Sequence, residues 1–202
     1  WDGWLLLRRA GTRRMTVTIR RARPGDAAAM ARVHVAAWRN AYPGLLPDAY
    51  LANLSVTREA AGYEQGLALG RGGDAGFLAI ADGSETPGGG VVGFVTGGFA
   101  RRAGIAEGEV ETLYLLDDFR ERGIGRRLMR AMASHLASLG AGSAFAWVLE
   151  GNPSRFFYER LGAKPAAREV IRFAGTELPQ RAYAWEAIHT LLTATAASQK
   201  PG

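Results

Sequence analysis

Apolar residues recur along this chain with two different periods, which predict strands and helices in alternation. Short runs rich in β-branched and aromatic residues predict strands at 16–21, 76–81, 91–97, 107–116, 143–149, 166–173 and 181–188. Apolar residues spaced by three and four predict helices at 24–39, 57–69, 123–139 and 153–161. This order predicts an α/β (α+β) fold, with a mixed, mostly antiparallel sheet of about seven strands flanked by about four helices.

The connections between these elements predict how the strands pair. The strands at 107–116 and 143–149 are joined through the helix at 123–139, and a right-handed crossover of this kind makes its two strands parallel. The last two strands should flank a turn at Gly175…Pro179. The other neighbours follow one another directly in the chain, so we expect them to be antiparallel.

A glycine-containing turn stands between the strand at 107–116 and the helix that follows it. Its sequence is Arg120-Glu121-Arg122-Gly123-Ile124-Gly125. Such a turn leaves several backbone N–H groups at the start of a helix without acceptors, and with the helix dipole they form an anion site suited to phosphate. The turn lacks the Gly-Lys-Ser/Thr of a P-loop and the third glycine of a dinucleotide fingerprint. By itself, Gly-x-Gly is also compatible with an ordinary strand-to-helix turn.

A second motif follows the strand at 143–149. In the segment Asn152-Pro153-Ser154-Arg155-Phe156-Phe157-Tyr158-Glu159-Arg160-Leu161-Gly162, Asn152 is typical of an N-cap, Pro153 of a first helical residue and Gly162 of a helix stop. The result would be a short helix that carries Tyr158.

Together, these motifs resemble those of the GNAT superfamily of acyl-CoA-dependent N-acyltransferases, over roughly residues 16–188. Arg120-x-x-Gly123-x-Gly125 is similar to its pyrophosphate-binding motif, and 109–115 to the strand before it. Asn152 through Gly162 is similar to its later Asn…Phe-Tyr-Glu-x-Leu-Gly motif, although Asn152 and Tyr158 are six residues apart where seven is commoner. The resemblance implies a V-shaped splay between strands 4 and 5, acetyl-CoA as cosubstrate, and an amine acceptor that approaches from the other side.

The resemblance also implies the residues that would bind acetyl-CoA. The backbone of Leu113, Tyr114 and Leu115 would bond the pantetheine amides, and Asn152 would bond the same arm unless it only caps a helix. The pyrophosphate would lie on the turn, where we expect contacts from Arg120, Arg122, Gly123, Ile124, Gly125 and Arg126. The alternative for the arginine side chains, Arg127 and Arg130 included, is a solvated helix face. Trp38, Tyr42 and the loop at 43–47 would lie on the acceptor side.

Acid–base chemistry points to the acidic residues of the strand at 107–116. Glu107, Glu109 and Glu111 alternate, so an undistorted strand places them on one face, where neighbouring carboxylates raise each other's pKa. A base must keep the attacking amine neutral, and Glu109 aligns with the family's usual glutamate. Glu111 is the second candidate, or an anchor for a cationic acceptor; an exposed acidic edge is the alternative for all three. Tyr158 would protonate the leaving sulfur, unless it is only a core tyrosine.

Composition narrows the remaining possibilities. The chain has no cysteine, which excludes disulfides, thiolate metal sites and a covalent acyl-cysteine, and the three histidines lack ligand-like spacing, so we expect no metal. A length of 202 residues predicts one domain at 16–190, with an extension at 1–15 and a tail at 191–202 that frays after Leu192. No apolar run suits a membrane span or a signal peptide, and we expect a cytoplasmic protein.

The net charge of +6 lies in the first 23 residues, which hold seven arginines and one acidic residue. We therefore expect a balanced globular body and a non-native or disordered leader, with Met15 as a candidate start. An Arg-rich arm that tethers an acyltransferase to nucleic acid is one alternative, which we disfavour. A regulatory module that binds CoA without catalysis is another, and transfer of a longer acyl chain is a third. The sequence leaves the acceptor open, and edge strands and the 181–188 segment suggest a homodimer.

Overall fold

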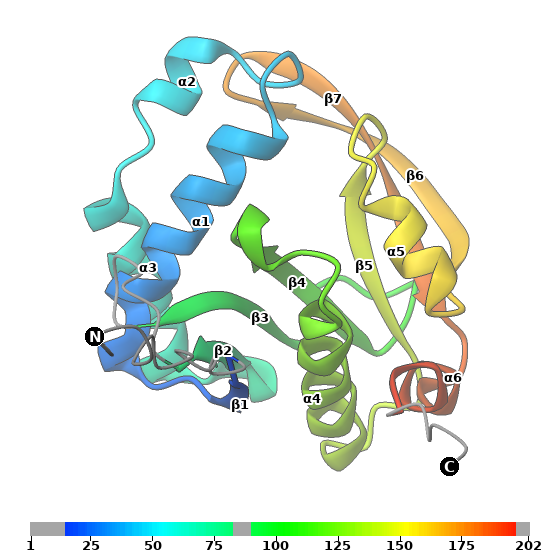
Figure 1. The fold of residues 1–202 in the computed structure, drawn as a ribbon. Coiled ribbons are helices and arrows are strands. Elements are labelled where there is room, and N and C mark those ends of the chain that lie inside the picture. The colour runs from blue at the N-terminus through cyan, green and yellow to red at the C-terminus, as the bar shows by residue number, and fades with distance from the viewer. Residues whose placement is uncertain (1–14, 83–89, 197–202) are drawn as a thin grey trace, which may run out of the picture.

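The computed structural model describes residues 15–82 and 90–196, so the basic arm at 1–14 and most of the Gly-rich loop lie outside the described residues. The described residues form seven strands with helices around them, arranged as in Figure 1. The strands are β1 (Val17–Arg21), β2 (Ala75–Ala81), β3 (Val91–Phe99), β4 (Gly108–Leu115), β5 (Ala144–Leu149), β6 (Lys164–Phe173) and β7 (Thr176–Trp185). The α-helices are α1 (Ala27–Ala41), α2 (Asp48–Ala52), α3 (Val56–Leu69), α4 (Ile124–Ser138), α5 (Arg155–Arg160) and α6 (Ile188–Thr195).

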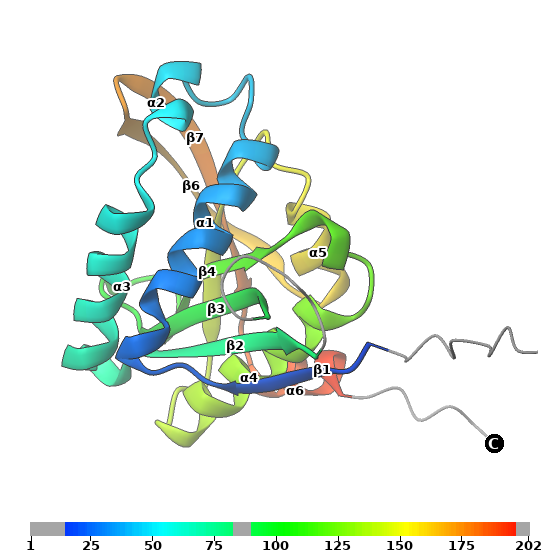
Figure 2. The same cartoon turned by 60° about the vertical axis from the view of Figure 1, so that its left-hand side comes forward.

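All seven strands form one sheet in the order β1-β2-β3-β4-β5-β7-β6. Every neighbouring pair is antiparallel except β4 and β5, which are parallel and joined through α4. The predicted fold class is therefore confirmed. Helices α1 and α3 cover one face of the sheet, and α4, α5 and α6 lie on the other (Figures 1 and 2).

The sheet opens between β4 and β5. Their pairing covers only Gly108–Val110, opposite Ala144–Ala146, and beyond Val110 the two strands diverge. At the same place, the register between β3 and β4 shifts, so that Thr112 pairs with Thr96 but Val110 pairs with Gly97. Glu111 is therefore the extra residue of a β-bulge, and bulges bend a strand away from its neighbour. This is the expected V-shaped splay between strands 4 and 5.

The largest cluster of buried side chains lies between the sheet and α4. It includes Leu128, Met129, Met132 and Leu136 from α4, all fully buried, against Val110 of β4. A second cluster lies between the sheet and α1 and contains Met30, Val33 and Phe94. None of the described helices is both long and apolar enough to cross a bilayer.

Several predicted boundaries are wrong at the C-terminal end. Strand β7 spans Thr176–Trp185 rather than 181–188, and the turn before it is Ala174-Gly175, whose φ angles of +49° and +79° suit a tight hairpin. Pro179 lies within β7. Because β7 pairs with both β5 and β6, the 181–185 part of the expected dimer segment is not a sheet edge.

Two short helices were not predicted. Helix α6 covers Ile188–Thr195, where a strand end and a fraying tail were expected, and it buries Leu191 completely against the α4 cluster. Helix α2 follows the predicted loop at 43–47, in a stretch for which no element was predicted. Both are short, so their apolar periodicity is too brief to recognise from the sequence.

Two glycine substitutions test the close approach of β3 and β4 at the bulge, with an open helical glycine for comparison. A Cβ at Gly97 would collide with the carbonyl oxygen of Glu109, whereas one at Gly62 of α3 meets nothing within 4 Å. We expect Gly97→Ala to lower the unfolding free energy by about 1–3 kcal/mol or more through overpacking, and Gly62→Ala to raise it by about 0.5–1 kcal/mol. Urea unfolding of both variants measures these changes. Equal effects at the two sites would contradict the close approach of β3 and β4.

Candidate active site

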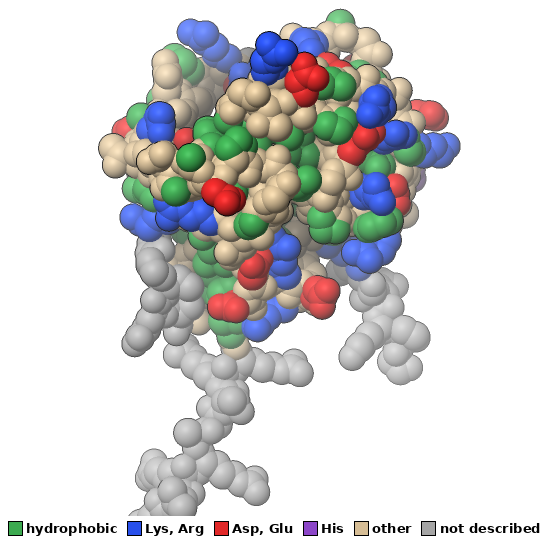
Figure 3. Space-filling view, turned by 90° about the horizontal axis from the view of Figure 1, so that it is seen from above, with side chains coloured by type: hydrophobic (Ala, Val, Ile, Leu, Met, Phe, Trp, Pro, Cys, Tyr) green, Lys and Arg blue, Asp and Glu red, His purple; other side chains and the backbone are tan. Residues whose placement is uncertain are grey.

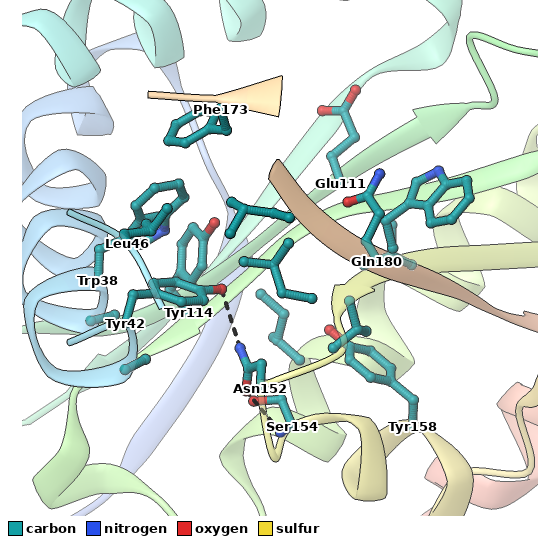
Figure 4. Close-up of a pocket in the computed structure, with 18 of the residues that line it drawn as sticks. Trp38, Tyr42, Leu46, Glu111, Tyr114, Asn152, Ser154, Tyr158, Phe173 and Gln180 are labelled. Carbon is teal, nitrogen blue, oxygen red and sulfur yellow. Dashed lines mark hydrogen bonds between the residues drawn. The ribbon is translucent and has the colours of Figure 1, made fainter. Parts of the chain in front are cut away.

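A cavity of about 250 Å³ occupies the opening between β4 and β5. Figure 4 shows side chains converging on it from α1, β4, β6, β7 and the segment after β5. Its floor includes Leu113 and Leu115, whose strand edge lies beyond the part of β4 paired with β5. This edge therefore has backbone groups available to a ligand in the V.

Tyr158 reaches the cavity from α5. The helix begins after Ser154 and ends in a Schellman motif, in which Ala163 donates to the Tyr158 carbonyl (3.1 Å) and Gly162 takes a φ of +84°. Burial raises the pKa of the Tyr158 phenol above its ordinary value, and the nearby Tyr42 adds to the shift. The phenol thus keeps its proton at neutral pH, and its ring points into the cavity (Figure 4).

Asn152 is a buried brace rather than the predicted N-cap. Its Oδ1 accepts from Ser154 N (2.8 Å), and its Nδ2 donates to Tyr42 Oη (3.2 Å), as Figure 4 shows. The N-cap is Ser154, and Pro153 precedes the helix. The Asn152 side chain therefore ties the turn after β5 to the end of α1 at the wall of the cavity.

The N-terminus of α4 lies close to two residues that line the cavity, because it follows Arg120 in the chain and packs against Leu115 at Gly125. Arg127 N donates to Gly123 O (3.2 Å), whereas the earlier amides of a helix have no acceptor within it. Gly123 is the N-cap with a φ of +75°, and a Cβ there would meet no atom within 4 Å. Gly125 differs, because its Cβ would stand 3.3 Å from Leu115 and 3.4 Å from Phe157. One glycine keeps the space above the turn open, and the other allows α4 to pack closely against β4 and α5.

The arginine side chains of this region make different contacts. Arg120 lines the cavity and pairs with Asp117 (2.9 Å), and Arg122 stacks over the Phe119 ring at 5.6 Å. Arg126 and Arg130 each donate to a carbonyl near the end of α6, those of Ala194 and Leu192. The last two side chains therefore stabilise a helix terminus, and only the backbone amide of Arg126 belongs to the turn.

Of the three glutamates, Glu111 lines the cavity wall. Burial raises the pKa of its carboxyl above the ordinary value, and Arg101 opposes the shift through an ion pair of 2.7 Å. Glu109 lies in the part of β4 that pairs with both β3 and β5. Glu107 accepts a hydrogen bond from Gly142 N beyond the strand, so the expected face of three carboxylates is wrong for this residue.

Comparison with known proteins identifies the family. The model of the acetyltransferase (GNAT) family matches residues 26–163. The chain is 30% identical over 178 residues to the uncharacterized N-acetyltransferase YuaI of Bacillus subtilis, covering 88% of this chain and 97% of that protein. This chain belongs to the GNAT acetyltransferase family. It is therefore a GNAT-family N-acetyltransferase, as its motifs predicted.

Solved structures of GNAT proteins share the fold. A GCN5-related N-acetyltransferase from Rhodopseudomonas palustris superposes with a TM-score of 0.63 at 22% identity, over 84% of this chain and 94% of that one. The putative acetyltransferase yncA of Salmonella typhimurium, solved with acetyl-CoA, has a TM-score of 0.58 at 20% identity, over 84% and 93%. The N-acetyltransferase PaiA of Thermoplasma acidophilum, solved with coenzyme A, has a TM-score of 0.59 at 16% identity, over 83% and 98%.

Sequence reasoning placed Trp38 and Tyr42 on the acceptor side, and both line the cavity of this N-acetyltransferase. It missed the residues that β6 and β7 bring over the opening, namely Ile171, Phe173, Leu178 and Gln180. It also missed Arg101, the ion-pair partner of Glu111. No local motif marks the residues of β6 and β7, because they reach the site only through the pairing of β7 with β5.

His34 supports the cavity from behind and should make the fold acid-sensitive. Its ring stacks on Tyr114 at 4.9 Å, its Nδ1 lies 2.9 Å from Tyr63 Oη, and burial lowers its pKa to about 4. The unfolded state, with a histidine pKa of about 6.5, binds the proton more readily, so stability falls as pH drops from about 6.5 to 4.

We expect this one group to remove about 2–3 kcal/mol of unfolding free energy between pH 7.5 and 4.5. Urea unfolding of wild type and His34→Gln at both pH values isolates the contribution, because other titrating groups are common to both proteins. Parallel losses in the two proteins would show that His34 takes up its proton within the fold.

Proposed function

We propose that this N-acetyltransferase transfers the acetyl group of acetyl-CoA directly to a primary amine. The observation that carries the proposal is the opening of the sheet beyond Val110. The cavity there contains a strand edge and the protonated phenol of Tyr158, and Arg120 of the turn before α4 lines it. A long, narrow ligand matches these features if its phosphate part lies at the start of α4, its amide groups on the strand edge and its thioester near Tyr158.

The residues fit acetyl-CoA as follows. The amides at the start of α4, from Gly123 onward, would hold the pyrophosphate, because the space above Gly123 is open. The backbone of Leu113, Tyr114 and Leu115 would bond the pantetheine amides. Arg120 adds a positive charge at the cavity wall. Solved relatives in complex with acetyl-CoA and with coenzyme A support this assignment.

Two side chains would move protons. Acetyl-CoA, when bound, supplies the thioester whose acyl carbon forms the new bond to the amine nitrogen as its bond to sulfur breaks. Glu111 accepts the proton that the amine loses, since it reaches the cavity and its raised pKa suits a base. Tyr158 donates its phenolic proton to the departing sulfur and regains one through solvent. The products are an amide and the free thiol of CoA. Glu109, the base that the family resemblance implied, remains the alternative.

Filling the space in front of the amides at the start of α4 should weaken acetyl-CoA binding. Gly123→Glu places a side chain and a negative charge in the open space, and we expect the affinity for acetyl-CoA to fall by at least about tenfold. Isothermal titration calorimetry measures the affinity. Gly70→Glu is the matched control, because Gly70 also has a positive φ and no atom within 4 Å of its Cβ, but ends α3. Equal binding by both folded variants would refute the assignment of the pyrophosphate site to the start of α4.

The two glutamates can be told apart by kinetics. We expect Glu111→Gln to lower kcat by about 100-fold, within the range for loss of a general base, with little change in acetyl-CoA affinity. Glu109→Gln should stay close to wild type. Release of CoA thiol under saturating cosubstrate measures kcat for each variant. A larger loss in Glu109→Gln would transfer the role of base to Glu109.

Arg101 provides the pH test of the same assignment. Its guanidinium lowers the pKa of Glu111, so Arg101→Gln should raise that pKa. Activity is lost as pH falls through the pKa of a base, so the acidic limb of the kcat/KM profile should move to higher pH in the variant. Because the Arg101 side chain is 68% exposed, low ionic strength gives the clearest shift. An unchanged limb would argue against Glu111.

A further inference from the structure

The acceptor half of the cavity is aromatic rather than acidic. It is formed by the end of α1, the loop after it and the β6–β7 hairpin, which lie on the side opposite Tyr158 (Figure 4). Trp38 is the centre of this wall, with ring centroids 5.0 Å from Tyr42, 5.8 Å from Phe173 and 6.4 Å from Tyr114. Leu46, Ile171 and Leu178 complete it with aliphatic carbon. A substrate group in this half would therefore contact rings and methyl groups.

The charges of the cavity are already balanced. Among the described residues that line it, the charged side chains are Glu111 and Arg120. Glu111 pairs with Arg101 at 2.7 Å, and Arg120 pairs with Asp117 at 2.9 Å. A second ammonium group on the acceptor would thus enter an aromatic pocket without an unpaired carboxylate, and an uncompensated buried charge is costly.

A neighbouring cavity does contain further acidic residues. Glu59 and Asp74 line it together with Arg101, and Glu111 belongs to the wall of both cavities. The Arg101 guanidinium lies 2.7 Å from Glu111 and 3.6 Å from Asp74, so a cation of the protein already pairs with these two carboxylates. The second ammonium group of a diamine would have to compete with it.

Figure 3 shows the end of the molecule that carries α2 and the β6–β7 hairpin, where hydrophobic side chains gather over the middle and Arg, Lys, Asp and Glu side chains lie between and around them. This face therefore carries charges of both signs and is not predominantly acidic.

We infer that the acceptor is a primary amine with a neutral aromatic or branched aliphatic group, which packs against the wall formed by Trp38 and Phe173 while the amine faces Glu111. This inference rests on the proposed acetyl transfer and names its substrate class. It replaces the cationic acceptor that the row of glutamates had suggested. Trp38 and Phe173 then act as specificity-determining residues, because they contact the part of the acceptor that does not react.

The test compares two amines in a CoA-release assay at saturating acetyl-CoA, after calorimetry has shown that acetyl-CoA binds. We expect kcat/KM for 2-phenylethylamine to exceed that for putrescine by at least about tenfold. Phe173→Ala should lower kcat/KM for 2-phenylethylamine at least about tenfold, mainly through KM. Val170→Ala is the control, since Val170 lies on the same strand, is 54% exposed and does not line the cavity.

The outcomes of this test distinguish a failure of the acceptor inference from a failure of the proposed acetyl transfer. Preference for putrescine, equal rates for both amines, or no acetylation of either amine by protein that binds acetyl-CoA would overturn the aromatic acceptor and leave the cosubstrate site intact. An effect of Phe173→Ala confined to kcat, or matched by Val170→Ala, would also overturn it. Failure to bind acetyl-CoA would instead refute the proposed function, and the inference with it.

Discussion

The divergence of β4 from β5 is the constraint on which the rest of this structure depends. The two strands are parallel neighbours for three residues and then separate, at the β-bulge formed by Glu111. A separated strand leaves backbone groups without partners, which a folded protein satisfies with solvent or a ligand. The backbone groups that lose their partners when the sheet opens are thus the same groups that can bind a ligand within it. The bulge also brings the Glu111 carboxylate to the cavity wall.

The elements around the opening hold it at a defined width. Helix α4 packs its buried methionines and leucines against the sheet below the V, and Gly125 permits close contact with Leu115. The hydrogen bond between Asn152 and Tyr42 connects the segment after β5 to α1. Phe173 of the β6–β7 hairpin also lines the cavity. Three separate contacts, two of them between segments distant in the chain, therefore shape one cavity.

The electrostatics of the site follow from burial. Tyr158 is buried and the Glu111 side chain is 27% exposed, and desolvation raises the pKa of each. Arg101 opposes the shift at Glu111. His34 lies behind Tyr114 as a neutral ring, because burial lowers its pKa to about 4. The same desolvation that tunes the site thus makes the fold sensitive to acid.

The sequence by itself determined the strand and helix order, the parallel pair around α4 and the two motifs that name the family. These depend on local period, on turn residues such as Gly123 and Gly162, and on the handedness of crossovers. Only the tertiary structure decided that Glu111 lies at the cavity while Glu107 turns away, that Asn152 braces Tyr42, and that Phe173 lines the cavity. A bulge shifts a strand's register, and a hairpin's place in the sheet depends on long-range pairing, so neither leaves a local pattern in the chain.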